Sequence, residues 1–247
     1  MSGHSKWSTI KRKKGALDSK RGKIFTKVIK EISIAVKEGG PDPDGNPRLR
    51  LAIQNAKGVN MPKDNIDRAI KKNAGADADS YIETTYEGYA SHGVAVFVEC
   101  TTDNINRTVQ NVRATFNKYG GNLGTNGSLQ FIFTRKGIFT IPVPEEFNEE
   151  DFTLNMIDAG AEDVAVEDNY IHITCALEDF GKTHKVLESL SIESESAELQ
   201  RVPNTLVKLE DEAFLKVMKL IEHLEDDDDV QKVYHNIDVT EEQMEMI

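Results

Sequence analysis

The chain has 247 residues, a formal net charge of −12, and 38% hydrophobic against 29% charged residues. This length and composition can build two or three packed domains, which excludes a wholly disordered protein. The apolar runs fall short of a membrane span, and the N-terminal segment lacks the apolar core of a secretory signal, so we expect a cytoplasmic protein. Cys100 and Cys175 form no CxxC pair, and we expect both to be small buried apolar side chains.

The charge is divided unevenly along the chain. Residues 1–75 carry 18 Lys and Arg against 7 Asp and Glu, whereas residues 76–247 carry 12 against 35. A basic segment attracts polyanions, while an acidic body resists non-specific contact. The sequence therefore predicts nucleic acid as the partner of the first 75 residues.

The basic segment is expected to be helical after an irregular arm of residues 1–17. Apolar residues at spacings of three and four predict a helix that begins near residue 18 and ends at Gly39. Asn46 and Pro47 predict the start of a second helix, which runs to about Lys57. A third helix is expected between Pro62 and Gly75.

The remainder alternates between strand and helix patterns after a predicted polar linker at residues 76–85. Strand 137–143, helix 147–159, strands 163–167 and 170–175, helix 179–190 and strand 196–202 form a βαββαβ unit. Flanking patterns are interpreted as a second such unit, which the first interrupts. Its expected elements are strand 93–100, helix 103–119, strand 128–133, strand 205–209, helix 211–225 and strand 230–237.

The predicted fold class is therefore α+β, with an N-terminal helical domain followed by two ferredoxin-like (βαββαβ) α/β domains, one inserted in the other. The expected boundaries are a basic helical domain at residues 1–78, a discontinuous α/β domain at 79–134 and 203–247, and an inserted α/β domain at 135–202.

Basic residues in the first 75 positions are the candidate nucleic-acid contacts. Lys20, Lys23, Lys27 and Lys30 recur at helical spacing, which places them on one face opposite the apolar stripe. Trp7 could stack on an unpaired base or anchor the arm to the helices. The full candidate set is Lys6, Trp7, Lys11, Arg12, Lys13, Lys14, Lys20, Arg21, Lys23, Lys27, Lys30, Arg48, Arg50, Lys63 and Arg68.

Other patterns indicate less chemistry. The glycine-rich loop 119–128 leaves a helix and enters a predicted strand, the reverse of a phosphate-binding loop, so we expect a glycine C-cap and turn. The run Asp226–Asp229 lacks calcium-loop spacing, and we expect a solvated, mobile loop. No catalytic or metal-ligating motif stands out, so we expect no catalytic residue, metal or cofactor.

Several long motifs together resemble the YebC family over nearly the whole chain. They are Gly3-His-Ser-Lys-Trp7, Lys20-Arg-Gly-Lys-Ile-Phe-Thr-Lys27, Asn46-Pro-Arg-Leu-Arg50, Asn60-Met-Pro-Lys-Asp-Asn-Ile66, Tyr86-Glu-Gly-Tyr89, Val98-Glu-Cys-Thr-Thr-Asp-Asn104 and Asn106-Arg-Thr108. The resemblance implies a three-domain α+β protein of the bacterial cytoplasm without cofactor or enzyme activity. Members are commonly described as probable DNA-binding transcriptional regulators, while others, including mitochondrial relatives, act in translation on ribosomes.

The leading hypothesis is a non-enzymatic nucleic-acid-binding regulator of gene expression, with DNA-binding transcriptional regulation placed first. The alternative is a ribosome-associated translation factor that binds rRNA or tRNA and relieves stalling, for example at proline stretches. A further hypothesis is a scaffold whose acidic domains bind a basic protein, and a hydrolase acting in a cleft between domains is least favoured. We expect no membrane partner, and a monomer rather than an oligomer.

Overall fold

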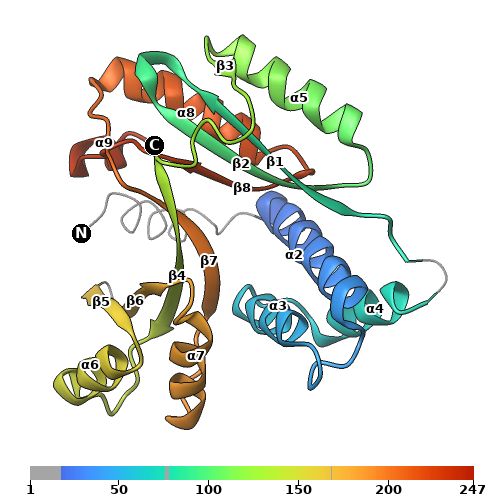
Figure 1. The fold of residues 1–247 in the computed structure, drawn as a ribbon, viewed down its shortest axis with the longest axis vertical. Helices are drawn as coiled ribbons and strands as arrows, with labels where there is room; N and C mark the ends of the chain where they lie inside the picture. Colours follow the sequence, from blue (N-terminus) through green and yellow to red (C-terminus); the bar gives the residue numbers. More distant parts are fainter. Residues whose placement is uncertain (1–17, 76–77, 168) are drawn as a thin grey trace. The chain divides into compact units, whose positions relative to one another are not determined.

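The computed structural model describes residues 18–75, 78–167 and 169–247, and for residues 18–20 it describes the backbone only (Figure 1). Contacts within the chain divide it into two compact units. The first takes the described residues up to Ile34, together with Gly75–Thr134 and Val202–Ile247, and the second takes Ala35–Ala74 and Arg135–Arg201.

Three helices open the described chain, as predicted: α2 (Asp18–Gly39), α3 (Pro47–Gly58) and α4 (Lys63–Asn73). Asn46 caps α3, because its Oδ1 accepts from the Leu49 amide at 3.0 Å. The Nδ2 of the same side chain donates to the carbonyls of Ala35 and Gly40 at 2.7 and 2.8 Å. One buried asparagine therefore joins the end of α2 to the start of α3.

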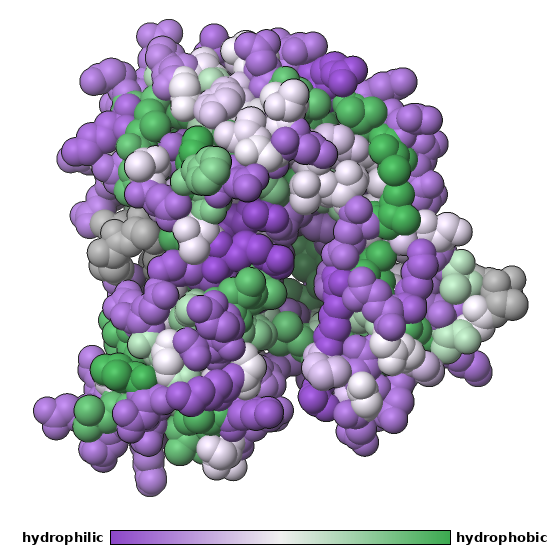
Figure 2. Space-filling view, in the orientation of Figure 1, coloured by the Kyte–Doolittle hydropathy of each residue, from purple (hydrophilic) through white to green (hydrophobic). Residues whose placement is uncertain are grey.

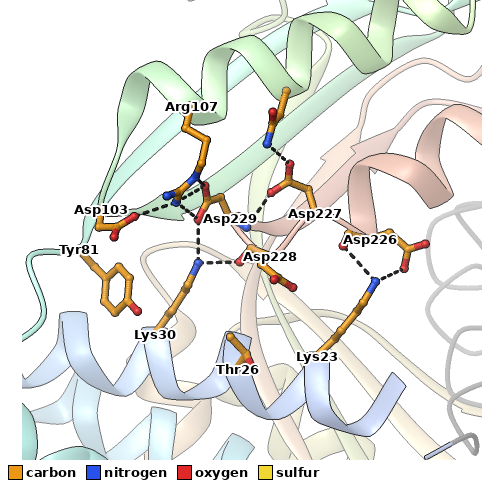
Figure 3. Close-up of a pocket in the computed structure, with 11 residues that line it drawn as sticks. Lys23, Thr26, Lys30, Tyr81, Asp103, Arg107, Asp226, Asp227, Asp228 and Asp229 are labelled. Carbon is orange, nitrogen blue, oxygen red and sulfur yellow. Dashed lines mark hydrogen bonds and ion pairs between the residues drawn. The ribbon is translucent and has the colours of Figure 1, made fainter. Parts of the chain in front are cut away.

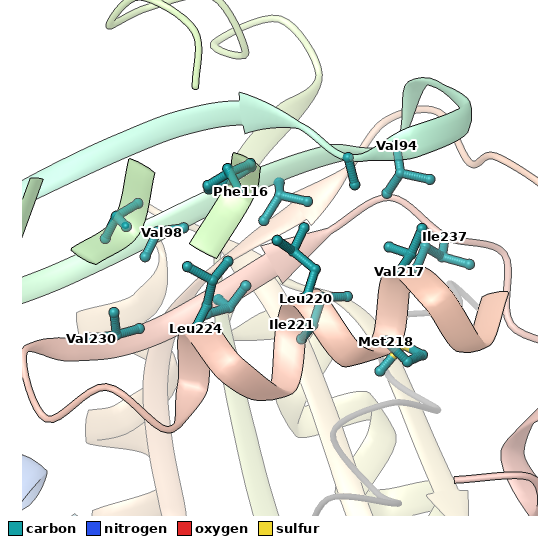
Figure 4. Close-up of a cluster of buried hydrophobic side chains, with 14 of the residues drawn as sticks. Val94, Val98, Phe116, Val217, Met218, Leu220, Ile221, Leu224, Val230 and Ile237 are labelled. Atoms are coloured by element: carbon teal, nitrogen blue, oxygen red, sulfur yellow. The ribbon is translucent and has the colours of Figure 1, made fainter. Parts of the chain in front are cut away.

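The first unit contains a four-stranded sheet in the order β3-β1-β2-β8. Its strands are β1 (Ile82–Tyr89), β2 (Ala95–Thr102), β3 (Asn122–Leu123) and β8 (Val230–His235), and the helices α5 (Ile105–Lys118) and α8 (Asp211–Glu225) pack on one face. Figure 4 shows this core, in which Val98, Phe116 and Leu220 are almost fully buried. A smaller cluster of buried side chains includes Phe97 of β2 and Tyr234 of β8, which pack with Leu129. The turn η1 (Ser91–Gly93) links β1 to β2, and α9 (Glu241–Glu245) ends the unit.

The second unit contains a sheet in the order β5-β6-β4-β7. The chain order is β4 (Phe133–Pro142), α6 (Glu149–Asp158), β5 (Ala161–Glu167), β6 (Tyr170–Ala176), α7 (Phe180–Ser189) and β7 (Ser196–Pro203). The first and third strands of this βαββαβ unit form its centre, which is the predicted ferredoxin-like arrangement. Phe139, Ile171 and Met156 are fully buried between sheet and helices.

The α+β class and the inserted βαββαβ unit are confirmed, whereas three predictions for the interrupted sheet are wrong. The supposed linker at 76–85 runs into β1, whose exposed polar residues hid the strand. Residues 128–132 are turns, because the Gly127 and Leu129 amides donate to the Glu87 carboxylate instead of to a neighbouring strand. Residues 205–209 form only an isolated parallel bridge between Val207 and Ile237.

These differences change the order of elements in the interrupted sheet. Two strands precede α5, and a single strand follows α8, so the chain order is ββαβ before the insertion and αβ after it. The division into three domains stays a prediction.

On the face shown in Figure 2, hydrophilic residues cover most of the surface and hydrophobic residues lie in separate patches. Among the described residues, none of the helices could span a membrane.

Candidate nucleic-acid interface

The lysines of α2 contact an acidic segment, Glu225–Asp229, which contains the last residue of α8 and its connection to β8. Lys23 Nζ donates to the Asp226 carbonyl at 3.1 Å and to Asp226 Oδ1 at 3.0 Å. Lys27 Nζ donates to the Glu225 carbonyl at 2.8 Å. Cations are favoured at a helix C-terminus, where backbone carbonyls lack intrahelical partners. Lys23 and Lys27 therefore neutralise the end of α8, and Figure 3 shows the contact of Lys23 with Asp226.

Asp229 is the centre of this contact and is only 3% exposed. Lys30, which is 5% exposed, donates to Asp229 Oδ1 at 3.0 Å, to the Asp228 carbonyl at 2.6 Å and to the Thr101 carbonyl at 3.1 Å. Arg107 binds both carboxylate oxygens of Asp229, and Thr108 Oγ1 donates to Oδ2 at 2.9 Å. The prediction of a solvated loop is therefore wrong for Asp229, because three donors hold its carboxylate in the interior.

The protonation of Asp229 follows from these contacts. Burial raises the pKa of the carboxyl, but hydrogen bonds from Arg107, Lys30 and Thr108 outweigh burial and lower the pKa below its ordinary value. The same contacts with Asp229, followed by those with Asp103, raise the pKa of Arg107. Asp229 is therefore ionised throughout the physiological range, and the cluster is a permanent ion network.

A cavity of about 630 Å³ opens beside this network, entirely within the first unit. Its charged lining consists of Lys23, Lys30, Arg107, Asp103 and Asp226–Asp229. Carboxylates outnumber cations there, and a phosphate would be repelled. The cavity is therefore a poor candidate for nucleic acid, and the network is better suited to fastening α2 to the sheet.

The remaining predicted contacts fall into three groups. Six of them, Lys6, Trp7, Lys11, Arg12, Lys13 and Lys14, lie outside the described residues, as does the side chain of Lys20. Three contact other residues of the chain. Arg21 lies 5.7 Å from the centre of the Phe25 ring, and Arg48 pairs with Glu38 at 2.8 Å. Arg50 donates to the carbonyls of Pro43 and Asp44. Lys63 and Arg68 are exposed on α4.

The exposed surface of α4 offers cations without competing partners. Among the described residues, Lys63, Arg68 and Lys71 are exposed, and their side chains have no hydrogen bond or ion pair. The opposite side of α4 buries Ile66, Ala69 and Asn73. The helix is therefore fixed by its apolar side while these cations face solvent.

The glycine-rich loop ends α5 as predicted. The Gly121 amide donates to the Phe116 carbonyl at 2.8 Å and the Gly120 amide to Asn117 at 3.2 Å, which is the Schellman pattern, and Gly120 has φ of +76°. Further along, the carboxylate of buried Glu87 accepts from the amides of Gly127 and Leu129 at 2.8 and 2.6 Å. These amides already donate to Glu87 and are therefore not free to donate to a phosphate.

Sequence reasoning missed the partners of the α2 lysines. Arg107, Thr108 and Asp229 lie more than 70 residues from Lys30, so no local spacing relates them. The available signal was complementarity between a row of lysines and a run of four aspartates at the end of a predicted helix. Among the described residues, no group of three or more His, Cys, Asp or Glu side chains could hold a metal ion.

Comparisons with known proteins cover nearly the whole chain. Residues 5–76 match the model of the TACO1/YebC protein N-terminal domain, and residues 81–237 match that of the TACO1/YebC second and third domain. A probable transcriptional regulatory protein of Amoebophilus asiaticus is 59% identical over 96% of this chain and 98% of its own length. The probable transcriptional regulatory protein YrbC of Bacillus subtilis is 51% identical over 96% and 99%. A crystal structure of a conserved hypothetical protein from Aquifex aeolicus has a TM-score of 0.81 at 44% identity, covering 91% of this chain and 93% of that one.

Proposed function

Because the chain belongs to the TACO1/YebC family, we propose that it is a non-enzymatic, cytoplasmic regulator of gene expression that binds nucleic acid through its basic N-terminal region. Relatives that match over the full length are named probable transcriptional regulatory proteins, which supports duplex DNA as the first ligand to consider. The observation that carries the proposal is the set of exposed, unpartnered cations on α4, within a segment that is far more basic than the rest of the chain.

The connection between α3 and α4 supports this choice of helix. Residues 59–62 join the two helices, a connection of the length used in helix-turn-helix motifs, whose second helix approaches DNA. Lys63 and Lys71 are eight residues, or about 12 Å, apart along the helix axis. Asp64 and Asp67 are also exposed on α4 and oppose the binding of phosphates, but Lys63, Arg68 and Lys71 outnumber them. Cations that neutralise phosphates carry no sequence information, so α4 is expected to discriminate weakly between bases.

The test is the binding of a fluorescent DNA duplex to the full-length protein over a series of salt concentrations. Replacing Lys63, Arg68 and Lys71 by Ala should weaken binding and reduce the slope of log K against log salt by about 0.9 for each phosphate that the variant no longer neutralises. The matched control replaces Lys182, Lys185 and Lys208, exposed cations outside the basic region, by Ala. Equal behaviour of the two triple variants would contradict the assignment of α4.

A second candidate is a ribosome-associated factor that binds structured RNA. Binding through phosphates without base discrimination, as expected for α4, suits folded RNA as well as DNA. An RNA duplex of the same sequence in the same titration separates the two ligands. Preference for RNA, with weaker binding by the α4 variant, would favour translation, whereas preference for DNA would favour transcription.

A further inference from the structure

A long stretch of the acidic body contains no acidic residue. Between Asp103 and Glu145 the chain has no Asp or Glu, although an even spread of 35 acids over the 172 residues after position 75 would put about eight there. The stretch contains Arg107, Arg113, Lys118, Arg135 and Lys136. It is therefore a basic island in the part of the chain that overall charge would exclude from polyanion binding.

The helix α5 supplies most of this island. Its inner side buries Thr108, Val112 and Phe116 against the sheet. Its outer side carries cations, amides and one alanine, all exposed: Asn106, Arg107, Gln110, Asn111, Arg113, Ala114, Asn117 and Lys118. Helical spacing of three and four places Gln110, Arg113 and Asn117 in one row along this side.

The two ends of the outer side are in different environments. Near the N-terminus of α5, Arg107 binds Asp229, and Asn111 Nδ2 donates to Asp227 Oδ2 at 3.0 Å. Toward the C-terminus, Gln110, Arg113 and Asn117 have no side-chain partner among the described residues. Lys216 of α8 adds a cation at this end. Its Nζ lies close to Gly120, just after α5, at 3.6 Å from the position that a Cβ on that glycine would take.

We infer that the outer side of α5 from Gln110 to Lys118 is a second nucleic-acid contact of this protein. Arg113 and Lys118 bind phosphates, and Gln110 and Asn117 hydrogen-bond to the edges of bases or sugars. Exposed Ala114 lies among them and leaves room for a strand to approach the helix. This inference rests on the proposed function and extends it to a surface in the first unit, separate from α4 in the second.

The pattern of side chains distinguishes this surface from an ordinary solvated helix. A solvated helix commonly pairs acids and bases at spacings of three and four, whereas this side of α5 has cations and amides only, apart from Ala114. Amides add hydrogen-bonding capacity without charge, which is the chemistry of groove recognition. Duplex DNA and folded RNA share the phosphodiester backbone, so both are used as probes.

Two double variants of the full-length protein separate the two kinds of contact. Replacing Arg113 and Lys118 by Ala should weaken binding of the DNA or RNA duplex about tenfold near 100 mM salt and reduce the salt slope by up to about two. Replacing Gln110 and Asn117 by Ala should weaken binding several-fold with the salt slope unchanged. The matched control, Lys185→Ala with Lys208→Ala, makes the same charge change and should bind like wild type.

Thiol protection gives a readout that does not depend on charge. The native cysteines are buried, with exposures of 2% and 0%, and burial raises the pKa of both thiols, that of Cys100 to about 12. A cysteine introduced as Ala114→Cys is therefore the reactive thiol of the folded protein. Bound duplex should slow its modification by a maleimide at least severalfold, while Leu154→Cys, at a position 62% exposed on α6, should react at an unchanged rate.

The outcomes separate this inference from the proposed function. Unprotected Ala114→Cys, together with α5 variants that bind like wild type, would overturn the inference even if the α4 variant binds more weakly. Protection at Ala114→Cys with weaker binding by both α5 variants would support it. If wild type binds neither duplex, the proposed function and this inference fail together.

Discussion

Asp229 receives its hydrogen bonds from two different helices, and this determines what each of its partners contributes. Lys30 comes from α2, while Arg107 and Thr108 come from α5. A buried carboxylate is costly unless its charge and lone pairs are satisfied. The network therefore links α2, α5 and the start of β8 through one side chain.

The first prediction concerns the asymmetry between Asp229 and Lys30. Asp229→Asn leaves the ammonium of Lys30, whose side chain is 6% exposed, without its anion and should lower the free energy of unfolding by about 3–5 kcal/mol. Lys30→Met should cost less, about 1–2 kcal/mol, because Arg107 and Thr108 still satisfy Asp229. Urea unfolding followed by circular dichroism at pH 7 measures both. An equal decrease in the two variants would contradict this account.

The difference in unfolding free energy between wild type and Asp229→Asn should change with pH in one direction. The folded-state pKa of Asp229 lies below its ordinary value, so its contribution is complete at neutral pH. The contribution disappears as pH falls from about 4 toward the folded-state pKa, because protonated Asp229 then resembles Asn. The stability difference between wild type and Asp229→Asn should therefore narrow in acid, and a constant difference would show that Asp229 is already protonated at neutral pH.

At the scale of elements, α3 packs closely on the strand region of the second unit. Gln54 Nε2 donates to Ser194 Oγ at 2.6 Å, and Asn55 exchanges hydrogen bonds with the backbone of Ala197 at 3.0 and 3.1 Å. Gly58 ends α3 at a point where a Cβ would overlap the backbone of Glu195. The absence of a side chain at this position is therefore a packing requirement.

The second prediction tests this approach. Gly58→Ala should lower the free energy of unfolding by about 1–3 kcal/mol, because the helix or the Glu195 backbone must move. Gly181→Ala in α7 is the control: nothing lies within 4 Å of its added Cβ, and alanine is the better helix former, so stability should be unchanged or rise by up to about 1 kcal/mol. Thermal unfolding of both variants decides, and a Gly58→Ala protein as stable as the Gly181→Ala protein would contradict the packing argument.

Elements with strong local signals could be predicted from the sequence. The cap at Asn46 located the start of α3, and the predicted strands at 163–167 and 170–175 match β5 and β6 within two residues. The strand β1 was missed because its first residues are exposed and mostly polar, whereas the failure at 128–132 has a tertiary cause, because Glu87 takes the amides of residues 127 and 129. The candidate site shows the same limit, since nothing near Lys30 in the sequence indicated a buried partner at Asp229.

At the scale of the whole molecule, the separation of charge is less strict than the totals imply. Basic side chains of α2 are neutralised by the acidic segment, and the acidic body carries the basic island of α5. Long-range repulsion from a net charge of −12 still opposes binding of nucleic acid and is screened by salt. The affinity for nucleic acid therefore depends on which cations are exposed and also on which cations are free of ion pairs with the acidic segment.

The third prediction follows from the exposed end of the α2 contact. The side chains of Lys23 and Asp226 are 44% and 65% exposed, so their pair adds at most about 1 kcal/mol of stability. Asp226→Asn should leave stability nearly unchanged and remove the anion that neutralises Lys23, although the backbone carbonyl of residue 226 still accepts from it. If Lys23 then turns to a phosphate, duplex binding should strengthen about two- to fivefold at low salt and the salt slope should steepen by about one. Glu150→Gln, an equal charge change at an exposed position of α6, controls for repulsion alone. Tighter binding by both variants without a change in slope would mean that Lys23 stays away from the ligand, and the α2 row would then serve only to hold the fold.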